Sequence, residues 1–116
     1  MSNIDAFAFL REAKQLISVG KKDFIKRTYD HPSGRKVKWI EALLDIGLSN
    51  PSQAWDETLK LTPDDFIDGP CEDSDRPHEG KVIWIFKKEI NGVSAYIKLK
   101  IDSRRGCVCL SFHKDW

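Results

Sequence analysis

Three residues in the last third of the chain carry groups that could perform acid–base chemistry. Lys87, Tyr96 and His113 provide an ammonium group, a phenol and an imidazole. An imidazole can accept or donate a proton near neutral pH, because its ordinary pKa is about 6.5. A phenol, with an ordinary pKa near 10, is a weak base unless neighbouring cations favour the phenolate, as Lys87 and Lys98 could do here. Side by side, these groups could transfer protons and stabilise an anion.

A β-hairpin should bring the first two residues together. Residues 82–90 and 93–101 are rich in β-branched and aromatic side chains, and Asn91-Gly92 joins them. Both turn residues tolerate a positive φ, which makes this pair the commonest sequence for a type I′ turn. A two-residue turn places Lys87 directly opposite Tyr96.

A third strand, residues 107–112, follows a short loop and should extend the hairpin into a meander. We expect Ile101 to pair with Val108, which places Tyr96 opposite His113. Side chains alternate between the two faces of a sheet, so this register predicts one apolar and one polar face. The apolar face would consist of Val82, Trp84, Phe86, Ile97, Leu99, Ile101, Val108, Leu110 and Phe112. The polar face would consist of Lys87, Tyr96, Lys98, Lys100, Ser111 and His113. The alternative is that the polar face is an ordinary solvated sheet surface, on which lysine is common.

The first two-thirds of the chain predict mainly helices. Apolar residues recur with helical spacing over residues 3–19, and Gly20 is a plausible end of that helix. The other expected elements are a short strand within 21–27, a turn at 31–34, a helix over 37–46, helix starts at Asn50-Pro51 and Thr62-Pro63, and an irregular segment over 68–81. We therefore expect a single α+β domain spanning residues 1–116. Its N-terminal helices would pack on a small antiparallel sheet that ends in a three-stranded meander.

Composition narrows the class of protein. No run approaches the roughly 18 apolar residues of a membrane span, and the first residues lack the pattern of a secretory signal. The three cysteines form neither a disulfide framework nor a zinc spacing, which indicates a cytoplasmic protein. The acids Glu72, Asp73 and Asp75 do not match a calcium loop, so we expect no metal and no cofactor.

The net charge of +1 hides an uneven distribution along the chain. Residues 1–40 carry nine Lys or Arg against four Asp or Glu, residues 41–80 two against eleven, and residues 81–116 eight against three. The three segments therefore have net charges of +5, −9 and +5. This pattern indicates a basic surface for a polyanion. Alternatively, the acidic middle folds over the basic ends and neutralises them.

Four segments resemble the motility quorum-sensing regulator (MqsR) toxin family. They are Leu61-Thr-Pro-Asp-Asp-Phe66, Ile83-Trp84, Tyr96-Ile-Lys98 and Ser111-Phe-His113. The resemblance implies a RelE-like fold and a toxin that cleaves messenger RNA without the ribosome. It also implies a partner, a cognate antitoxin of the DNA-binding helix-turn-helix type. Tyr96 matches the family's functional tyrosine, whereas His113, Asp68 and Ile85 stand where the family member compared has lysine, lysine and glutamine.

RNA carries its own nucleophile, the 2′-hydroxyl beside the scissile phosphate. A metal-independent endoribonuclease therefore needs a base, an acid and cations that stabilise the charge on phosphorus. We expect His113 to be the general acid or base and Tyr96 its partner or a phosphate-positioning group. The expected transition-state cations are Lys98, Lys87 and Arg76, and the expected RNA-binding residues are Lys100 and Ser111.

Two alternatives use the same residues differently. A non-catalytic RNA-binding module would use the basic and aromatic face to hold single-stranded RNA without cutting it. A protein-interaction module would use the acidic middle of the chain or an exposed tryptophan such as Trp116, unless that side chain packs back onto the fold.

Overall fold

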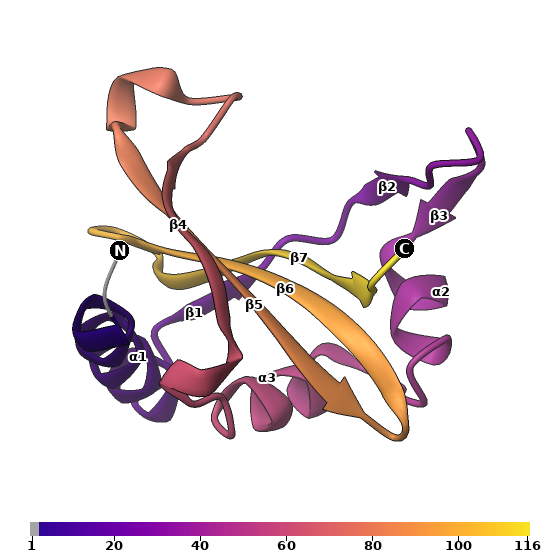
Figure 1. Ribbon diagram of the computed structural model, residues 1–116, viewed down its shortest axis with the longest axis horizontal. Helices are drawn as coiled ribbons and strands as arrows, with labels where there is room; N and C mark the ends of the chain where they lie inside the picture. Colours follow the sequence, from indigo (N-terminus) through magenta and orange to yellow (C-terminus); the bar gives the residue numbers. More distant parts are fainter. Residues whose placement is uncertain (1–2) are drawn as a thin grey trace.

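The computed structural model describes residues 3–116 as an α+β fold in which helices cover one face of a five-stranded sheet (Figure 1). The helices are α1 (Asn3–Ser18), α2 (Trp39–Leu44), α3 (Pro51–Thr58) and the short 3₁₀ helices η1 (Pro63–Asp65) and η2 (Pro77–Glu79). The strands are β1 (Lys22–Phe24), β2 (Thr28–Asp30), β3 (Lys36–Lys38), β4 (Phe66–Glu72), β5 (Lys81–Ile90), β6 (Val93–Asp102) and β7 (Gly106–Lys114).

The main sheet has the strand order β1-β7-β6-β5-β4, and β2 and β3 form a separate two-stranded ribbon. Strands β4 to β7 pair antiparallel, but β1 pairs parallel to β7. The sheet is therefore mixed, which corrects the expectation of a purely antiparallel sheet. The C-terminal meander of β5, β6 and β7 is confirmed.

The start and stop signals of the helices act as the sequence predicts. After α1, the amide of Gly20, at φ +83°, donates to the carbonyl of Ile17. Asn50 caps α3, because its side-chain oxygen accepts a hydrogen bond from the amide of Gln53 at 3.0 Å. Thr62 caps η1 in the same way.

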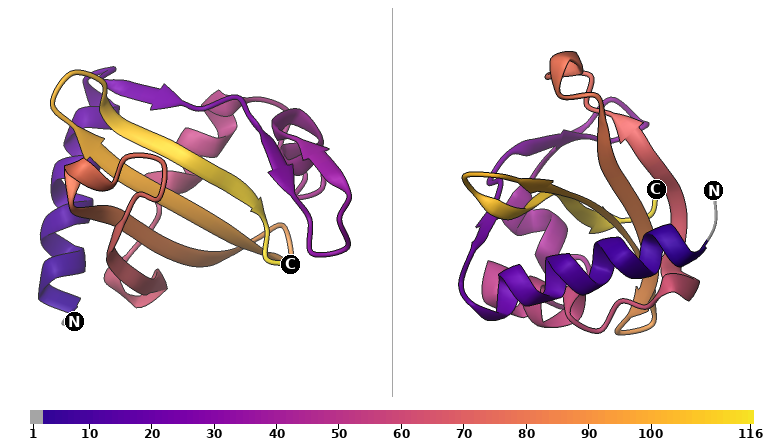
Figure 2. Two further views of the ribbon diagram at one scale, coloured as in Figure 1. Left: turned by 90° about the horizontal axis from the view of Figure 1, so that it is seen from above. Right: turned by 90° about the vertical axis from the view of Figure 1, so that its left-hand side faces the viewer.

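The core lies between the sheet and the helices beneath it. Helix α1 runs across the strands (Figure 2), and the ring of Phe9 stacks on Trp84 with centroids 4.9 Å apart. Trp55 of α3 and Leu43 of α2 join the same apolar cluster. Leu99 of β6, at its centre, is fully buried.

The hairpin register is confirmed. Asn91 has φ +52° and Gly92 has φ +78°, as a type I′ turn requires. Lys87 pairs with Tyr96, and Tyr96 pairs with His113. The predicted row therefore crosses three adjacent strands.

The pairing of β7 with β6 has one register at Tyr96 and His113 and a different register near the β6–β7 turn. Ile101 pairs with Cys107, not with Val108 as predicted, because the pairing shifts between Lys98 and Leu99. The shift leaves one extra residue, Leu110, on β7, as in a β-bulge.

The shift changes which side chains of β7 enter the core. The helix-side core contains Cys107 and Cys109. Val108 is buried opposite Lys100 on the other face, and Leu110 is only partly buried. The prediction that Val108 and Leu110 belong to the helix-side core is therefore wrong.

Three strands, β2, β3 and β4, lie where the sequence predicted no strand. Strand β4 occupies part of the segment expected to be irregular, and three register shifts interrupt its pairing with β5. A Cβ at Gly69 would lie 2.6 Å from the carbonyl oxygen of Ile83, so only glycine allows this approach. Strands β2 and β3 flank the predicted turn at 31–34, and β3 takes the residues expected to begin α2.

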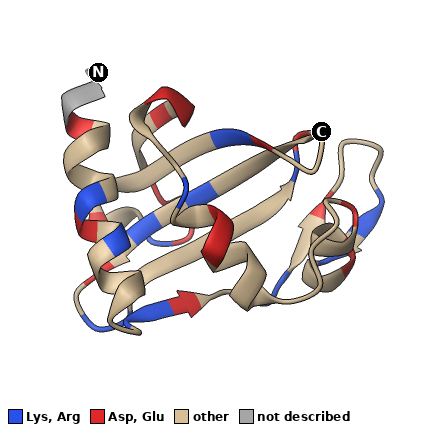
Figure 3. Cartoon of the chain, turned by 90° about the horizontal axis from the view of Figure 1, so that it is seen from below, with Lys and Arg blue, Asp and Glu red and all other residues tan. Residues whose placement is uncertain are grey.

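Acidic and basic segments alternate on the helix side of the molecule (Figure 3). On the other side, the acidic middle of the chain meets the basic end directly, because Asp73 and Glu79 form ion pairs with Lys100. None of the helices in the described part of the chain is long and apolar enough to cross a membrane.

Replacing Leu99 with alanine tests the core. We expect Leu99→Ala to lower the free energy of unfolding by about 2–5 kcal/mol, because the site is fully enclosed and cannot collapse onto the cavity. The matched control is Leu44→Ala on α2, where the side chain is 59% exposed. The control should change stability by less than about 0.5 kcal/mol. Urea denaturation measures both, and equal losses would contradict this packing.

Candidate functional site

A hollow of about 400 Å³ lies on the polar face of the sheet, lined by residues of β2, β6, β7 and the chain that connects β1 to β2. Figure 1 shows that the β2–β3 ribbon and the β4–β5 connection rise above this face at opposite ends of the sheet. The residues that give the hollow its chemistry are Arg27, Tyr29, Tyr96, Lys98, Ser111, His113 and Trp116. Four of them were predicted site residues: Tyr96, Lys98, Ser111 and His113.

His113 is the middle ring of an aromatic stack. Its centroid lies 5.1 Å from that of Tyr96, with an interplanar angle of 15°, and 4.0 Å from that of Trp116, with an angle of 7°. Tyr29 contacts the imidazole at 4.9 Å in a tilted orientation. Trp116 therefore packs back onto the fold rather than standing free for a partner.

The hydrogen bond at Nδ1 sets the tautomer of His113. Nδ1 lies 2.7 Å from the carbonyl oxygen of Lys114, which can only accept, so Nδ1 carries the proton. Burial lowers the pKa of His113, and the charges of Arg27 and Lys98 lower it further. The imidazole is therefore neutral at pH 7, and within residues 3–116 its Nε2 accepts no hydrogen bond.

The pKa of Tyr96 is shifted in the direction opposite to the one expected from neighbouring lysines, which would favour its phenolate. Burial raises the pKa of Tyr96, and the nearby Cys71 and Asp68 raise it further. The phenol therefore stays protonated and is a hydrogen-bond donor rather than a base. Burial also lowers the pKa of Lys98, followed by the charge of Arg27.

Arg27 is a site residue that the sequence analysis missed. Its guanidinium donates a 2.8 Å hydrogen bond to the hydroxyl of Ser111 and lies over the ring of Tyr29 at 5.3 Å. The phenol oxygen of Tyr29 in turn accepts a 3.2 Å hydrogen bond from the amide of Phe112, and burial raises the pKa of Tyr29 to about 12. The sequence did contain one indication of this pair. Arg27 lies two positions before Tyr29, and in an extended chain side chains two positions apart lie on the same side.

Lys87 lies in the predicted row, but its ammonium is paired with a carboxylate from the C-terminal residues. Its ammonium forms a 3.0 Å ion pair with Asp115. Lys98 therefore supplies positive charge to the hollow more directly than Lys87 does.

Lys100 is not available to an RNA strand. Its side chain is 1% exposed, and its ammonium lies 3.2 Å from Asp73 and 2.7 Å from Glu79. The connection between β4 and β5 covers it. The expectation that Lys100 binds the RNA backbone is therefore wrong.

The fold does not place Arg76 in the hollow that contains His113. Arg76 precedes η2 and lines a separate hollow near the β6–β7 turn together with Arg104 and Arg105. The expectation that it stabilises charge at the same site is therefore wrong.

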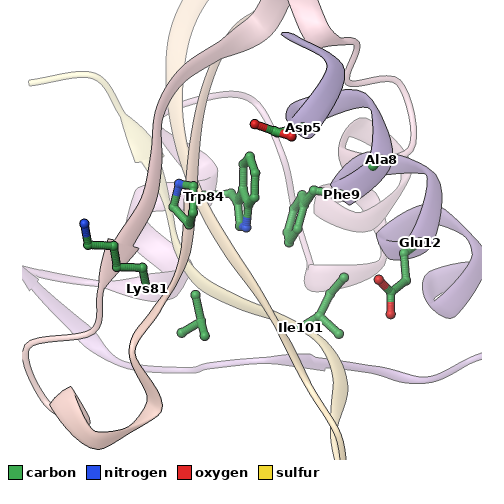
Figure 4. Close-up of a pocket in the computed structure, with 9 residues that line it drawn as sticks. Asp5, Ala8, Phe9, Glu12, Lys81, Trp84 and Ile101 are labelled. Carbon is green, nitrogen blue, oxygen red and sulfur yellow. The ribbon is translucent and has the colours of Figure 1, made fainter. Parts of the chain in front are cut away.

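A larger hollow, of about 650 Å³, lies on the helix side between α1 and β5 (Figure 4). Phe9 and Trp84 form its apolar wall, and Asp5, Glu12 and Lys81 lie around it. It has space for a ligand but no histidine, tyrosine or cysteine. The smaller hollow is therefore the candidate site.

Within residues 3–116, no group of three His, Cys, Asp or Glu side chains is arranged to hold a metal ion. Comparisons with protein-family models, with curated proteins and with solved structures find no match to this chain.

The effect of the Arg27 charge on the pKa of His113 should be measurable. We expect Arg27→Met to raise the pKa of His113, because it removes a cation that disfavours the protonated imidazole. Lys88→Met on the opposite face of β5 is the control and should leave this pKa unchanged. An NMR titration of the imidazole resonances measures both, and an unchanged or lower pKa in the Arg27 variant would contradict the proximity.

Proposed function

We propose that this chain is a metal-independent, ribosome-independent mRNA endoribonuclease that acts in the cytoplasm as the toxin of a toxin–antitoxin pair. The observation that supports the chemistry is a neutral His113, with Nε2 free, in one hollow with Arg27, Lys98 and a protonated Tyr96. The toxin role is supported by the resemblance of four sequence segments to the MqsR family.

In the proposed reaction, Nε2 of His113 accepts the proton of the RNA 2′-hydroxyl. The 2′-oxygen attacks the adjacent phosphorus, and the bond from phosphorus to the 5′-oxygen breaks. Tyr96 donates the proton that the departing 5′-oxygen needs. The products are a 2′,3′-cyclic phosphate and a free 5′-hydroxyl, and the charges of Arg27 and Lys98 stabilise the extra negative charge on phosphorus.

The aromatic stack also supports a second candidate, a module that binds single-stranded RNA without cleaving it. Every base has a π-face, so rings such as Tyr96 and Trp116 can hold bases without sequence preference. In that function Tyr96 stacks instead of donating a proton. Cleavage assays distinguish the two candidates.

The proposed antitoxin, a helix-turn-helix DNA-binding protein, neutralises the toxin by covering the rim of the same hollow. Arg27 and Lys98 supply positive charge at this rim, and its carboxylates Asp30 and Asp115 are paired with Lys36 and Lys87. An acidic segment of the partner would therefore complement it.

The decisive experiment is cleavage of single-stranded RNA in EDTA by the purified chain. We expect cleavage of RNA but not of DNA, which lacks the 2′-hydroxyl. His113→Ala should reduce the rate by about 10²–10⁴, the usual contribution of a general base. The matched control is His78→Ala on η2, which lies outside the hollow and should cleave normally.

Two further results define the role of Tyr96 and decide between the candidates. Tyr96→Phe should slow cleavage strongly if the phenol donates a proton, and only slightly if the ring stacks on a base. RNA that is bound but never cut by the wild-type chain would favour the binding module.

The pH dependence of cleavage should follow the neutral form of His113. Because burial lowers the pKa of His113, the base is already unprotonated at neutral pH and loses activity only as the pH falls through a value below 6.5. We therefore expect single-turnover rates to rise from acid pH and level off before neutrality. A rate that falls as the pH rises through this range would assign His113 to the acid role instead.

A further inference from the structure

Three arginines gather near the β6–β7 turn, away from the candidate site. Arg76, Arg104 and Arg105 line a hollow of about 430 Å³ together with Asp102 and Ser103. Arg76 belongs to the β4–β5 connection, which rises above the polar face (Figure 1). The hollow therefore lies at the rim of the face that carries His113.

The turn that carries two of the arginines is held by its own aspartate. One carboxylate oxygen of Asp102 accepts hydrogen bonds from the amides of Arg104 at 2.7 Å and Arg105 at 3.0 Å. The side chain of Arg105 lies 3.6 Å from Asp102 and 3.6 Å from Asp23. The nearest carboxylates are thus engaged in holding the turn and Arg105.

The segment that carries Arg76 is anchored at both ends by Lys100. The buried ammonium of Lys100 binds Asp73 on one side of Arg76 and Glu79 on the other. The carbonyl of Asp73 also accepts a 3.0 Å hydrogen bond from the amide of Arg76. This backbone is therefore fixed, whereas the side chains of Arg76 and Arg104 are exposed and form no ion pair within residues 3–116.

A fixed backbone with exposed guanidinium groups suits phosphate. Arginine presents paired N–H donors that match phosphate oxygens, and it keeps its charge at any physiological pH. Lys21 and Lys22 line the neighbouring hollow, which Arg104 and Arg105 share, together with the carboxylates of Glu12 and Asp102.

The spacing between the two hollows fits one nucleic-acid strand. On β6, Lys98 lines the first hollow and Asp102 the second, and four residues at about 3.3 Å each separate them by roughly 13 Å. The β4–β5 connection covers Lys100 between these two positions, so a strand has to pass around that connection. At about 3.4 Å per nucleotide, the direct distance alone corresponds to about four nucleotides.

We propose that Arg76, Arg104 and Arg105 bind backbone phosphates of the same single-stranded RNA that occupies the hollow at His113. The inference rests on the proposed function, since it takes RNA as the ligand of that hollow. It predicts that affinity depends on RNA length: a dinucleotide fills only the first hollow, whereas a longer strand reaches the arginines.

The test measures binding instead of cleavage. Fluorescence anisotropy is measured with the His113→Ala variant of the 116-residue chain, so that the RNA stays intact. The probes are a dinucleotide and a single strand of about twelve nucleotides, long enough to cross both hollows. The test variant adds Arg76→Gln and Arg104→Gln, and the matched control adds Arg11→Gln on α1, on the helix side of the sheet.

We expect the double arginine change to weaken binding of the longer RNA by about tenfold at low salt, as two exposed charge pairs contribute. It should also reduce the slope of log affinity against log salt by about 1.4, or 0.7 for each lost contact with a single strand. Dinucleotide binding should not change, and the Arg11 control should alter neither probe.

The possible outcomes separate this inference from the proposed function. Unchanged binding of the longer RNA, or an equal loss with the dinucleotide, would overturn the arginine site. RNA that binds with the expected arginine effect but is not cleaved by the wild-type chain would overturn the nuclease and leave the arginine site standing. If neither probe binds, both proposals fail.

Discussion

The alternation of side chains along β6 is the constraint on which both surfaces of the molecule depend. This central strand places Ala95, Ile97 and Leu99 in the core beneath the sheet. Between them it places Tyr96 and Lys98 in the hollow above the sheet. A slip of one residue would expose the apolar set and bury the polar set, so the stability of the core fixes the register of the chemical groups. The position of the phenol is thus determined by apolar packing on the opposite face.

Because of the bulge, β7 can place polar side chains in the hollow at one end and cysteine side chains in the core at the other. On the hairpin side of the bulge, His113 and Ser111 keep the register that puts them beside Tyr96 and Lys98. On the turn side, the shifted register directs the small thiols of Cys107 and Cys109 toward the helices. Burial raises the pKa of Cys107 to about 12, so this thiol is a packing group rather than a nucleophile.

The pairing of Lys87 with Tyr96 could be predicted because it follows from a two-residue turn and alternation. Tyr96 also pairs with His113 as predicted, although the pairing assumed at the β6–β7 turn was wrong, because the bulge offsets the difference. The bulge had no signal, because either register of β7 buries apolar residues. Arg27 was missed because its partner Ser111 is 84 positions away, and a three-residue parallel strand, β1, brings them together. The burial of Lys100 agrees with the alternative in which the acidic middle folds over a basic end, but no sequence signal identified this lysine as the one that is covered.

The buried ammonium of Lys100 also accounts for two of the negative charges of the acidic middle segment. A buried charge is tolerated only when it is paired and hydrogen-bonded, and Asp73 and Glu79 meet that need. These two carboxylates from the acidic middle are therefore used inside the fold. Arg27 and Arg104, by contrast, form no ion pair in the described chain and line separate hollows on the polar side. The acidic segment thus neutralises a buried lysine, whereas the exposed guanidinium groups of Arg27 and Arg104 stay outside these ion pairs.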